Sequence, residues 1–244
     1  MERNAYLEMA AVEERHWWFA GRRRVLAAII AWLGLKPGAS ILELGSGTGG
    51  NFAMLSQFGH ITAVEMNEAA RDISRTRLKS ADVRAGMLPH ELPLEGRKFD
   101  LICMFDVLEH VEDDAATLRQ LRAHLAPGGC GLITVPAYKA LFGPHDVELH
   151  HKRRYEYVEL RARLLEAGLR VEKLSFANAV LLPLAVAMRW LDRVTNRKQA
   201  SGAVMPPAPV NALFAMLFGA EAWILPWGNL PFGLSLLAVV TGGD

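Results

Sequence analysis

The stretch ILELGSGTGGN, residues 41–51, decides the fold because it joins an apolar strand to a glycine-rich turn. Its glycines form two overlapping patterns, GxGxxG and GxGxG, and the second follows an acidic residue. The residues concerned are Glu43, Gly45, Gly47, Gly49 and Gly50. In both patterns glycine lets the backbone turn sharply from strand to helix and approach a ligand closely. The stretch therefore predicts a nucleotide-type ligand at the end of a strand, and leaves open which one.

Strand-like and helix-like segments alternate along the chain, which is typical of a parallel sheet with helices on both faces. Two helical stretches come first, and the second is a buried helix that ends near Gly34. The expected strands cover residues 40–45, 60–66, 81–86, 99–105, 130–136, 169–177 and 230–242. The expected helices between them cover residues 51–58, 68–79, 113–125 and 158–168, with PGG at 127–129 as a turn. Apolar helical stretches at 178–195 and 209–226 form an insertion before the last strand.

Composition excludes some classes of protein. The 244 residues suffice for one α/β domain, and a net charge of +1 gives no electrostatic reason to expect a nucleic-acid partner. Cys103 and Cys130 fall in apolar runs, so we interpret them as reduced thiols of a cytoplasmic protein. They have no metal-ligand spacing, and no metal site is predicted.

Three features favour a methyl donor over a dinucleotide. The Glu43 carboxylate would repel a pyrophosphate but would attract the sulfonium and ammonium groups of S-adenosylmethionine. Asp106, Glu109 and His110 follow the fourth strand at the same edge of the sheet. The order strand, insertion, strand at the end of the chain suits a seventh strand that runs antiparallel beside the fifth. Glu65, which ends the second strand, suits the ribose hydroxyls of either cofactor.

Four motifs, ELGSGTG, VEM, FDLICMFDVLEHV and LAPGGCGLITVP, occur in the order and spacing of one family. Over residues 39–175 and the final strand, the chain resembles the class I S-adenosylmethionine-dependent methyltransferases. The resemblance implies a Rossmann-like α/β fold with seven strands in the order 3-2-1-4-5-7-6. It places helices on both faces and a helical insertion, residues 178–226, between strands six and seven. We expect an N-terminal helical lid over residues 1–38 and a methyltransferase domain over 39–244.

The resemblance also implies where the donor lies. The glycine loop would hold its amino-acid portion, Glu65 its ribose, and the loop after the third strand its adenine. Many relatives carry an aspartate in that last loop, where this chain has Met87, so backbone groups of Met87 and Leu88 and apolar packing are expected instead. The donor-binding residues so implied are Gly45, Ser46, Gly47, Thr48, Gly49, Glu65, Met66, Met87, Leu88, Phe105, Asp106 and His110.

An aromatic and basic segment, HWWFAGRRR at residues 16–24, precedes the first strand. Trp18 could close a lid on the donor, and Arg22 could pair with the donor carboxylate or with an acceptor phosphate. The alternative is an amphipathic helix whose aromatic residues pack on the core.

Methyl transfer mainly requires alignment of donor and acceptor, and a hydroxyl acceptor also gains from a base. The segment HDVELHHKRRYEY, residues 145–157, follows the fifth strand at the ligand-binding edge. We expect His150 or His151 to act as the base, oriented by Asp146, with Tyr155 as a further catalytic candidate. An exposed basic loop is one alternative, and metal binding is another, although the spacing matches no dense ligand set. His110 is expected to contact the donor rather than act as a base, and a packing or capping histidine is its alternative.

The insertion lacks the roughly 18–20 uninterrupted apolar residues that would span a bilayer. The residues that interrupt it are Pro183, Arg189, Asp192, Glu221 and Pro226. An interfacial anchor, a wall for an apolar acceptor, a homodimer surface and a helical cap remain open. Arg193, Arg197 and Lys198 would suit anionic head groups. The segments EERHWWFAGRRR (13–24) and HDVELHHKRRYEYVEL (145–160) and the apolar insertion resemble bacterial methyltransferases that often accompany polysaccharide and lipid-linked glycan enzymes, which implies a small-molecule or lipid-linked acceptor. We expect a cytoplasmic protein, with peripheral contact to the inner membrane as one option.

We therefore expect methyl transfer to a hydroxyl of a small-molecule or lipid-linked acceptor. A nucleic-acid or protein methyltransferase is an alternative, although the (N/D)PPY-type tetrapeptide of amino-methylating DNA enzymes is replaced by FDVLEH at 105–110. A non-catalytic, membrane-associated module that binds the donor, and a nicotinamide enzyme, are the remaining alternatives.

Overall fold

A computed structural model describes residue 7 and residues 10–187 and 205–243. Its seven strands form one sheet in the order β3-β2-β1-β4-β5-β7-β6, which confirms the expected order. The strands are β1 (Ala39–Leu44), β2 (Gly59–Glu65), β3 (Asp82–Ala85), β4 (Phe99–Phe105), β5 (Leu125–Pro136), β6 (Leu169–Ala177) and β7 (Ser235–Gly242). Strands β1 to β5 pair in parallel, and β7 runs antiparallel to both β5 and β6. The prediction of an antiparallel last strand beside the fifth is therefore confirmed.

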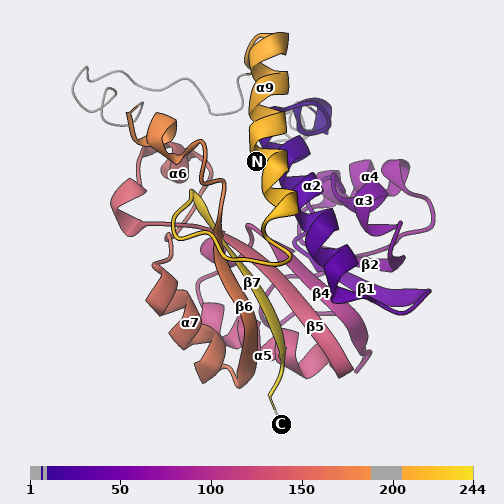
Figure 1. Cartoon of the computed structure of the whole chain (residues 1–244). Coiled ribbons are helices and arrows are strands. Elements are labelled where there is room, and N and C mark those ends of the chain that lie inside the picture. The colour runs from indigo at the N-terminus through magenta and orange to yellow at the C-terminus, as the bar shows by residue number, and fades with distance from the viewer. Residues whose placement is uncertain (1–6, 8–9, 188–204, 244) are drawn as a thin grey trace.

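Helices cover both faces of the sheet (Figure 1). They are α2 (Trp17–Leu33), α3 (Phe52–Leu55), α4 (Glu68–Arg77), α5 (Asp114–His124), α6 (Pro144–Glu148), α7 (Tyr157–Glu166) and α9 (Ala208–Gly219). Short 3-10 turns are η1 (Leu108–His110), η2 (Lys139–Leu141) and η3 (Ala220–Trp223). On one face, α5 and α7 contribute Leu118, Leu121, Leu160 and Leu164 to a hydrophobic core. On the other, α2 and α9 contribute Val25, Leu26, Ile29, Ile30 and Phe218 to a second core.

Helix α2 forms because its apolar residues recur on one face, which packs onto the sheet. His16 caps its start, where Nδ1 accepts a hydrogen bond from the Trp18 N–H at 3.3 Å. Gly34 ends it in the left-handed conformation, with φ of 65°, as expected for a glycine at a helix C-terminus. The start of α2 is fixed to α9 by a hydrogen bond from the Trp17 N–H to Asn211 Oδ1 at 2.8 Å, and Figure 1 shows the two helices side by side. The prediction of a buried helix ending near Gly34 is confirmed.

Several boundaries differ from the sequence prediction. The helix expected over 51–58 is only α3, one turn long. Strand β5 starts at Leu125, which pairs with Phe99, so the segment expected to be a PGG turn lies inside the strand beside a bulge. The helix expected over 209–226 ends at Gly219 and continues as η3, and Pro226 could not extend it because it lacks an N–H.

The first insertion helix is described only in part. Residues 182–187 form a helical turn, and the remainder of the predicted stretch lies outside the described residues. The same holds for Arg189, Asp192, Arg193, Arg197 and Lys198. Within the part of the chain that is described, no helix combines the length and apolar character needed to cross a membrane.

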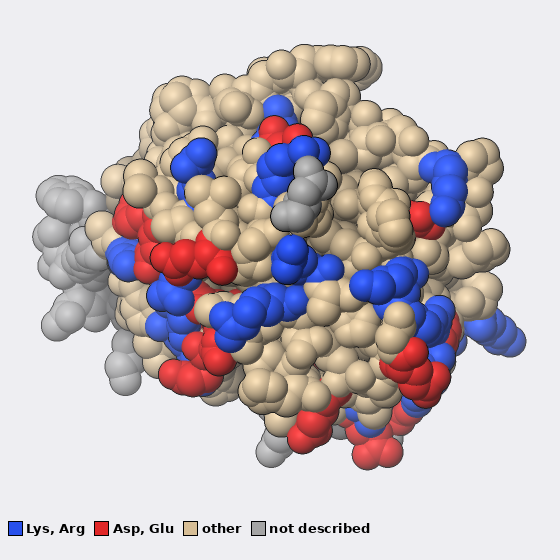
Figure 2. All heavy atoms as spheres, turned by 90° about the horizontal axis from the view of Figure 1, so that it is seen from below, with Lys and Arg blue, Asp and Glu red and all other residues tan. Residues whose placement is uncertain are grey.

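The face at which the parallel strands begin carries charges of both signs. Figure 2 shows this face from below, with Lys and Arg interspersed among Asp and Glu. Mixed charge gives no broad field of one sign on this side of the molecule. That fits the interpretation that no basic surface for nucleic acid lies on this face.

Candidate functional site

The glycine loop between β1 and α3 distinguishes the two sequence patterns. Gly45, Gly47 and Gly49 have φ of 68°, 54° and 80°, and Gly50 is outside this left-handed region. A Cβ on Gly45 would lie 2.7 Å from Val107, whereas a Cβ on Gly47 would have no atom within 4 Å. The loop thus packs against the segment after β4 at one glycine and opens to space at the next. GxGxG is the pattern that the backbone uses, and Gly47 is where a ligand can approach the main chain.

Glu13, which no sequence pattern singles out, lies against the same loop. Its buried carboxylate accepts a hydrogen bond from the Thr48 hydroxyl and forms an ion pair with Arg77 of α4. A Cβ on Gly50 would lie 2.7 Å from this carboxylate, so glycine is needed there to admit Glu13. The fourth glycine of the motif therefore serves the N-terminal segment rather than a dinucleotide. These partners lie far apart in the sequence, and no periodicity signals them.

Glu65 lies at the end of β2 beside the glycine loop. Its Oε2 accepts a hydrogen bond from the Gly47 N–H at 2.9 Å, and its Oε1 accepts one from the Asn67 N–H at 2.8 Å. Both bonds hold the carboxylate at the edge of the sheet where open α/β folds bind ligands. This position fits the ribose contact that the sequence predicts.

Glu43 on β1 is a buried carboxylate with one unsatisfied oxygen. Its Oε1 accepts a hydrogen bond from Asn51 Nδ2 at 2.7 Å, and its buried Oε2 has no partner among the described residues. Burial raises the pKa of Glu43 to about 7, although the Asn51 bond opposes that shift. An unpaired buried oxygen is costly and commonly marks a site for a further group. A cationic part of S-adenosylmethionine would meet this need, so the residues present fit that cofactor.

Because the pKa of Glu43 is raised, we expect the free energy of unfolding to depend on pH. Between pH 4.5 and about 7 the folded state holds a proton on Glu43 that the unfolded state releases, so this group lowers the free energy of unfolding as pH rises through that window. At ~1.4 kcal/mol per unit, the loss approaches about 3 kcal/mol. Urea unfolding of the wild type and of Glu43→Gln at pH 5, 6, 7 and 8 should show the wild type losing stability relative to the variant. If the free energies of unfolding of the wild type and Glu43→Gln changed in parallel with pH, the raised pKa of Glu43 would be contradicted.

Exposed methionines follow β2 and β3. The side chains of Met66, just after β2, and Met87, just after β3, are 67% and 45% exposed. The Met87 N–H donates to the Glu91 carbonyl at 2.9 Å, and the Glu91 N–H donates back at the same distance. The Met87 N–H is thus already bonded in this conformation, and the two exposed methionines offer apolar surface. The expected contact of adenine with backbone groups of Met87 and Leu88 and with apolar side chains stays a prediction.

Trp18 and Arg22 lie at the end of β4. Arg22 forms an ion pair with Asp106, and its guanidinium lies 4.3 Å from the centre of the Trp18 ring. Asp106 has φ of 55° and accepts a hydrogen bond from the Thr134 hydroxyl at 3.1 Å. Arg22, Asp106, Thr134 and Phe218 of α9 border a recess of only about 10 Å³. Helix α2 thus covers the carboxyl end of β4, as a lid would, and the assignment of Trp18 and Arg22 to donor binding stays a prediction.

Beyond β4, the structure brings together Glu109, His110 and His151. The Lys152 N–H donates to the Glu109 carbonyl at 2.8 Å, which holds the loop after α6 against η1. The rings of His110 and His151 are 4.7 Å apart between centres, and His151 Nε2 lies 4.0 Å from Glu109 Oε1. Burial, followed by the charge of Asp106, raises the pKa of Glu109 well above its usual value. Burial and then His151 lower the pKa of His110.

Asp146 of α6 orients His151 through a 2.9 Å contact between Oδ1 and Nδ1. The Asp146 carboxylate is buried and also accepts from Arg154 Nε at 2.7 Å and from the Gly143 N–H at 2.9 Å. The pairing of a histidine with Asp146 was expected from the sequence. Within that expectation, the geometry favours His151 over His150, whose side chain is exposed and whose φ is 59°.

Tyr155 does not fit a catalytic role. Its side chain is buried in the core, and its hydroxyl donates to Asp114 Oδ2 at 2.9 Å. Burial and the neighbouring Asp114 raise the pKa of this hydroxyl, so it does not ionise near neutral pH. Its segment pairs with Ala137 through an isolated bridge, and the Tyr155 ring packs in the hydrophobic core with Leu160 and Leu164.

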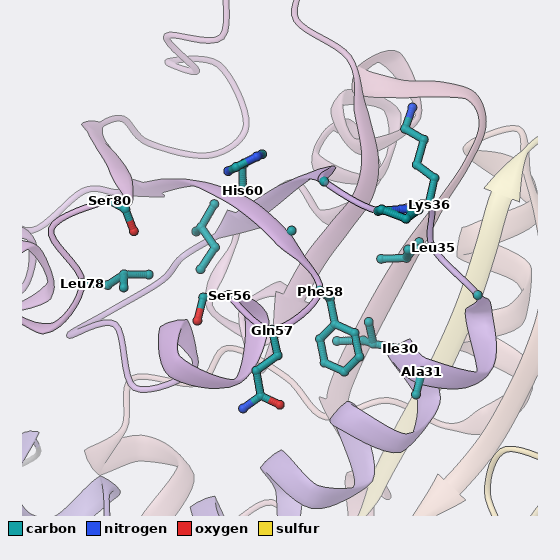
Figure 3. Close-up of a pocket in the computed structure, with 15 residues that line it drawn as sticks. Ile30, Ala31, Leu35, Lys36, Ser56, Gln57, Phe58, His60, Leu78 and Ser80 are labelled. Carbon is teal, nitrogen blue, oxygen red and sulfur yellow. The ribbon is translucent and has the colours of Figure 1, made fainter.

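A separate cavity of about 750 Å³ opens at the opposite edge of the sheet. It lies between the end of α2, the linker that follows and the turn from α3 to β2, and Lys36 and His60 are among its lining residues (Figure 3). Strands β1 and β2 start here, whereas ligands of open α/β folds bind where strands end. None of the predicted site residues lines this cavity.

The order of the strands, the glycine loop after β1 and the acidic residues Glu65 and Asp106 at the ends of β2 and β4 together define a class I S-adenosylmethionine-dependent methyltransferase fold. A family model described as a methyltransferase domain matches residues 18–179, so the chain belongs to this family. The resemblance to the class I S-adenosylmethionine-dependent methyltransferases is confirmed, and S-adenosylmethionine is the cofactor of this class. The acceptor is not defined by family membership.

Relatives agree with this assignment. A protein from Mycolicibacterium smegmatis, named as an S-adenosylmethionine-dependent methyltransferase, is 31% identical over 163 residues, which cover 65% of this chain and 62% of the relative. The ubiquinone/menaquinone biosynthesis C-methyltransferase UbiE of Vibrio vulnificus is 29% identical over 120 residues, 46% of each chain. The matches thus span less than two thirds of these relatives. A Haloferax volcanii methyltransferase, solved in a complex with a methyltransferase activator, has a TM-score of 0.62 at 19% identity and covers 96% of this chain and 92% of that chain, which shows the fold alone.

Proposed function

We propose that this protein transfers a methyl group from S-adenosylmethionine to a hydroxyl of a small-molecule or lipid-linked acceptor. The observation that carries the proposal is the adjacency of two features at one edge of the sheet. The glycine loop packs against Val107, and the cluster of Glu109, His110 and His151 begins two residues later. A donor loop and a group of proton-accepting side chains are what methyl transfer to a hydroxyl requires.

Each part of the site has a defined task in this proposal. Bound S-adenosylmethionine supplies an electrophilic methyl group on a sulfonium. Gly47 admits the donor to the backbone, Glu65 accepts hydrogen bonds from its ribose, and Glu43 balances its positive charge. Arg22 shields the end of β4 from water. The cluster around His151 lies where an acceptor hydroxyl can be ionised.

An exposed apolar patch supports a lipid-linked acceptor. Trp223 and Trp227 are 85% and 82% exposed, and Ile224 between them is 51% exposed. This patch follows α9, whose Phe218 borders the recess at Asp106. Tryptophans with one apolar face suit a membrane interface or an acyl chain. A homodimer through the same patch is the competing explanation, and the same experiment separates the two.

The test uses donor labelled on its methyl group. Purified protein is incubated with a lysate and membranes of the source organism, and products are separated into organic, aqueous and precipitated fractions. We expect label in the organic fraction at about tenfold or more above a Gly47→Asp control, and less label with a Trp223→Ser, Trp227→Ser double variant. Gly47→Asp is a suitable control because its Cβ would meet no atom within 4 Å, and because aspartate is one of the residues that tolerate the left-handed φ of 54° at this position.

Other outcomes would correct specific parts of the proposal. Label in the aqueous fraction would support methyl transfer but exclude a lipid-linked acceptor. The exposed tryptophan patch would then be assigned to a homodimer interface. Label in the precipitate would favour a protein or nucleic-acid acceptor. Absence of label above the control, with intact donor binding, would favour a non-catalytic module.

A further inference from the structure

The cluster beyond β4 is built from side chains of the types that bind metal ions. Glu109, His110 and His151 each offer one ligand atom, and these atoms all lie within 4.8 Å of one another. We propose that these three residues bind a divalent transition-metal ion, which holds the acceptor hydroxyl during methyl transfer. The binding of the metal stands on its own geometry, and its role toward the acceptor rests on the proposed function.

The burial of the Glu109 carboxylate is the first independent observation that supports a metal site. Its side chain is fully buried, and neither carboxylate oxygen has a hydrogen-bond partner within the described residues. Buried carboxylates are normally paired, hydrogen-bonded or bound to a metal, because an isolated one is costly. Among the described residues no Lys or Arg forms an ion pair with Glu109, and His151 Nε2 lies 4.0 Å from its Oε1. A cation between these two atoms would satisfy both.

His151 is oriented for coordination. Its Nδ1 contacts Asp146 Oδ1 at 2.9 Å, so the tautomer with a proton on Nδ1 leaves the lone pair of Nε2 directed to Glu109 and His110. A carboxylate behind a ligating histidine is the usual second partner in metal sites. Asp146 is itself fixed by Arg154 Nε at 2.7 Å and by the Gly143 N–H at 2.9 Å. The side chain that would bind the ion is therefore held from behind by a carboxylate that two further bonds fix in place.

The ligand types favour a particular group of ions. Two imidazoles and one carboxylate suit zinc and the neighbouring first-row ions rather than calcium or magnesium. Bonds of about 2.1 Å place adjacent ligand atoms roughly 3.4 Å apart in a tetrahedron. The 4.0 Å between His151 Nε2 and Glu109 Oε1 needs only a small closing movement. His110 is exposed and can turn by its side-chain torsions. Three protein ligands would leave at least one position for the acceptor.

In this arrangement every proton and electron pair of the methyl transfer has a defined destination. An acceptor hydroxyl coordinated at the open position would have a lowered pKa and would release its proton to solvent. Its oxygen lone pair would form the new O–C bond while the C–S bond of the donor breaks. The electron pair of that bond would stay on sulfur and give S-adenosylhomocysteine. His151 would then act as a ligand rather than as the base that the sequence suggests.

Cobalt(II) provides a test with a readout that does not depend on activity. The tag-free full-length protein is stripped with a chelator and titrated with Co²⁺, and the visible absorption bands of protein-bound cobalt are followed. We expect saturation at one ion per chain and displacement of the bands by Zn²⁺. His151→Ala and Glu109→Gln are each expected to weaken binding by about tenfold or more. His90→Ala, at an exposed histidine outside the cluster, should leave the titration unchanged.

Measuring donor binding on the same samples distinguishes failure of the proposed metal site from failure of the proposed donor site. Calorimetry with S-adenosylmethionine shows whether each variant is folded and whether the donor site is correct. Donor binding without Co²⁺ bands in the wild type, or bands that survive both His151→Ala and Glu109→Gln, would overturn the metal site and leave the proposed function standing. Co²⁺ bands without donor binding would retain the metal site and overturn the donor assignment.

Discussion

Replacement of Glu65 by alanine is expected to lower the affinity for S-adenosylmethionine by about two orders of magnitude or more. A carboxylate that accepts two hydrogen bonds contributes ~1.5–3 kcal/mol for each, and about 1.4 kcal/mol is a tenfold change. Glu65 is already fixed by the N–H groups of Gly47 and Asn67 at 2.9 and 2.8 Å, so the ligand meets a carboxylate that needs little further ordering. Isothermal titration calorimetry of the wild type and the variant measures the change directly.

Two further variants control this experiment. Glu65→Gln keeps the size and one acceptor oxygen of the side chain, so its loss should be smaller than that of Glu65→Ala. Glu68→Ala removes an exposed carboxylate three residues away, in the first turn of α4, and should bind the donor like the wild type. Unchanged affinity in Glu65→Ala would show that the ribose lies elsewhere.

The sequence predicts the sheet well because buried parallel strands are short apolar runs. Strand β6 has the predicted bounds, and β4 begins and ends as expected. Sheet order came from the resemblance rather than from periodicity, which carries no information on which strands pair. Boundaries such as the start of β5 at Leu125 were missed because a bulged ladder has no clear sequence pattern.

The donor side of the site was predictable because its parts are local motifs. Gly45 to Gly49 follow β1 directly and Glu65 ends β2, so their position at the sheet edge follows from the strand assignments. The contacts of Glu13 with Thr48 and Arg77 span 35 and 64 residues, and no local pattern encodes them.

The acceptor side depends on burial, which residue types alone do not reveal. Tyr155 and His151 lie four residues apart in one basic segment, yet the hydroxyl of Tyr155 is bonded in the core and His151 faces the cluster. Glu109 was noted beside His110, but its complete burial and unpaired oxygens appear only in three dimensions. The sequence therefore locates the candidate residues, and packing selects among them.

Asp146→Ala is expected to lower the free energy of unfolding by about 3–5 kcal/mol, the usual cost of removing one partner of a buried ion pair. The variant would leave the buried Arg154 without the carboxylate that its Nε donates to at 2.7 Å. It would also release His151 and the Gly143 N–H. Urea unfolding measures the loss, and Glu148→Ala, which removes an exposed carboxylate of the same helix, should lie close to the wild type.

The pH dependence identifies the cause of this loss. Burial raises the pKa of Asp146, but the bonds from His151 and Arg154 outweigh it, so the folded-state pKa lies below the usual value. A lowered folded-state pKa contributes stability that is present above the ordinary carboxyl pKa of about 3.9 and disappears as pH falls below it. The difference between the wild type and Asp146→Asn should therefore be constant from pH 8 to about 5 and shrink in more acidic solution. If the difference in the free energy of unfolding between the wild type and Asp146→Asn stayed constant below about pH 4, the charge of the carboxylate would not be what stabilises α6 and His151. The packing and neutral hydrogen bonds of the side chain would then account for the effect.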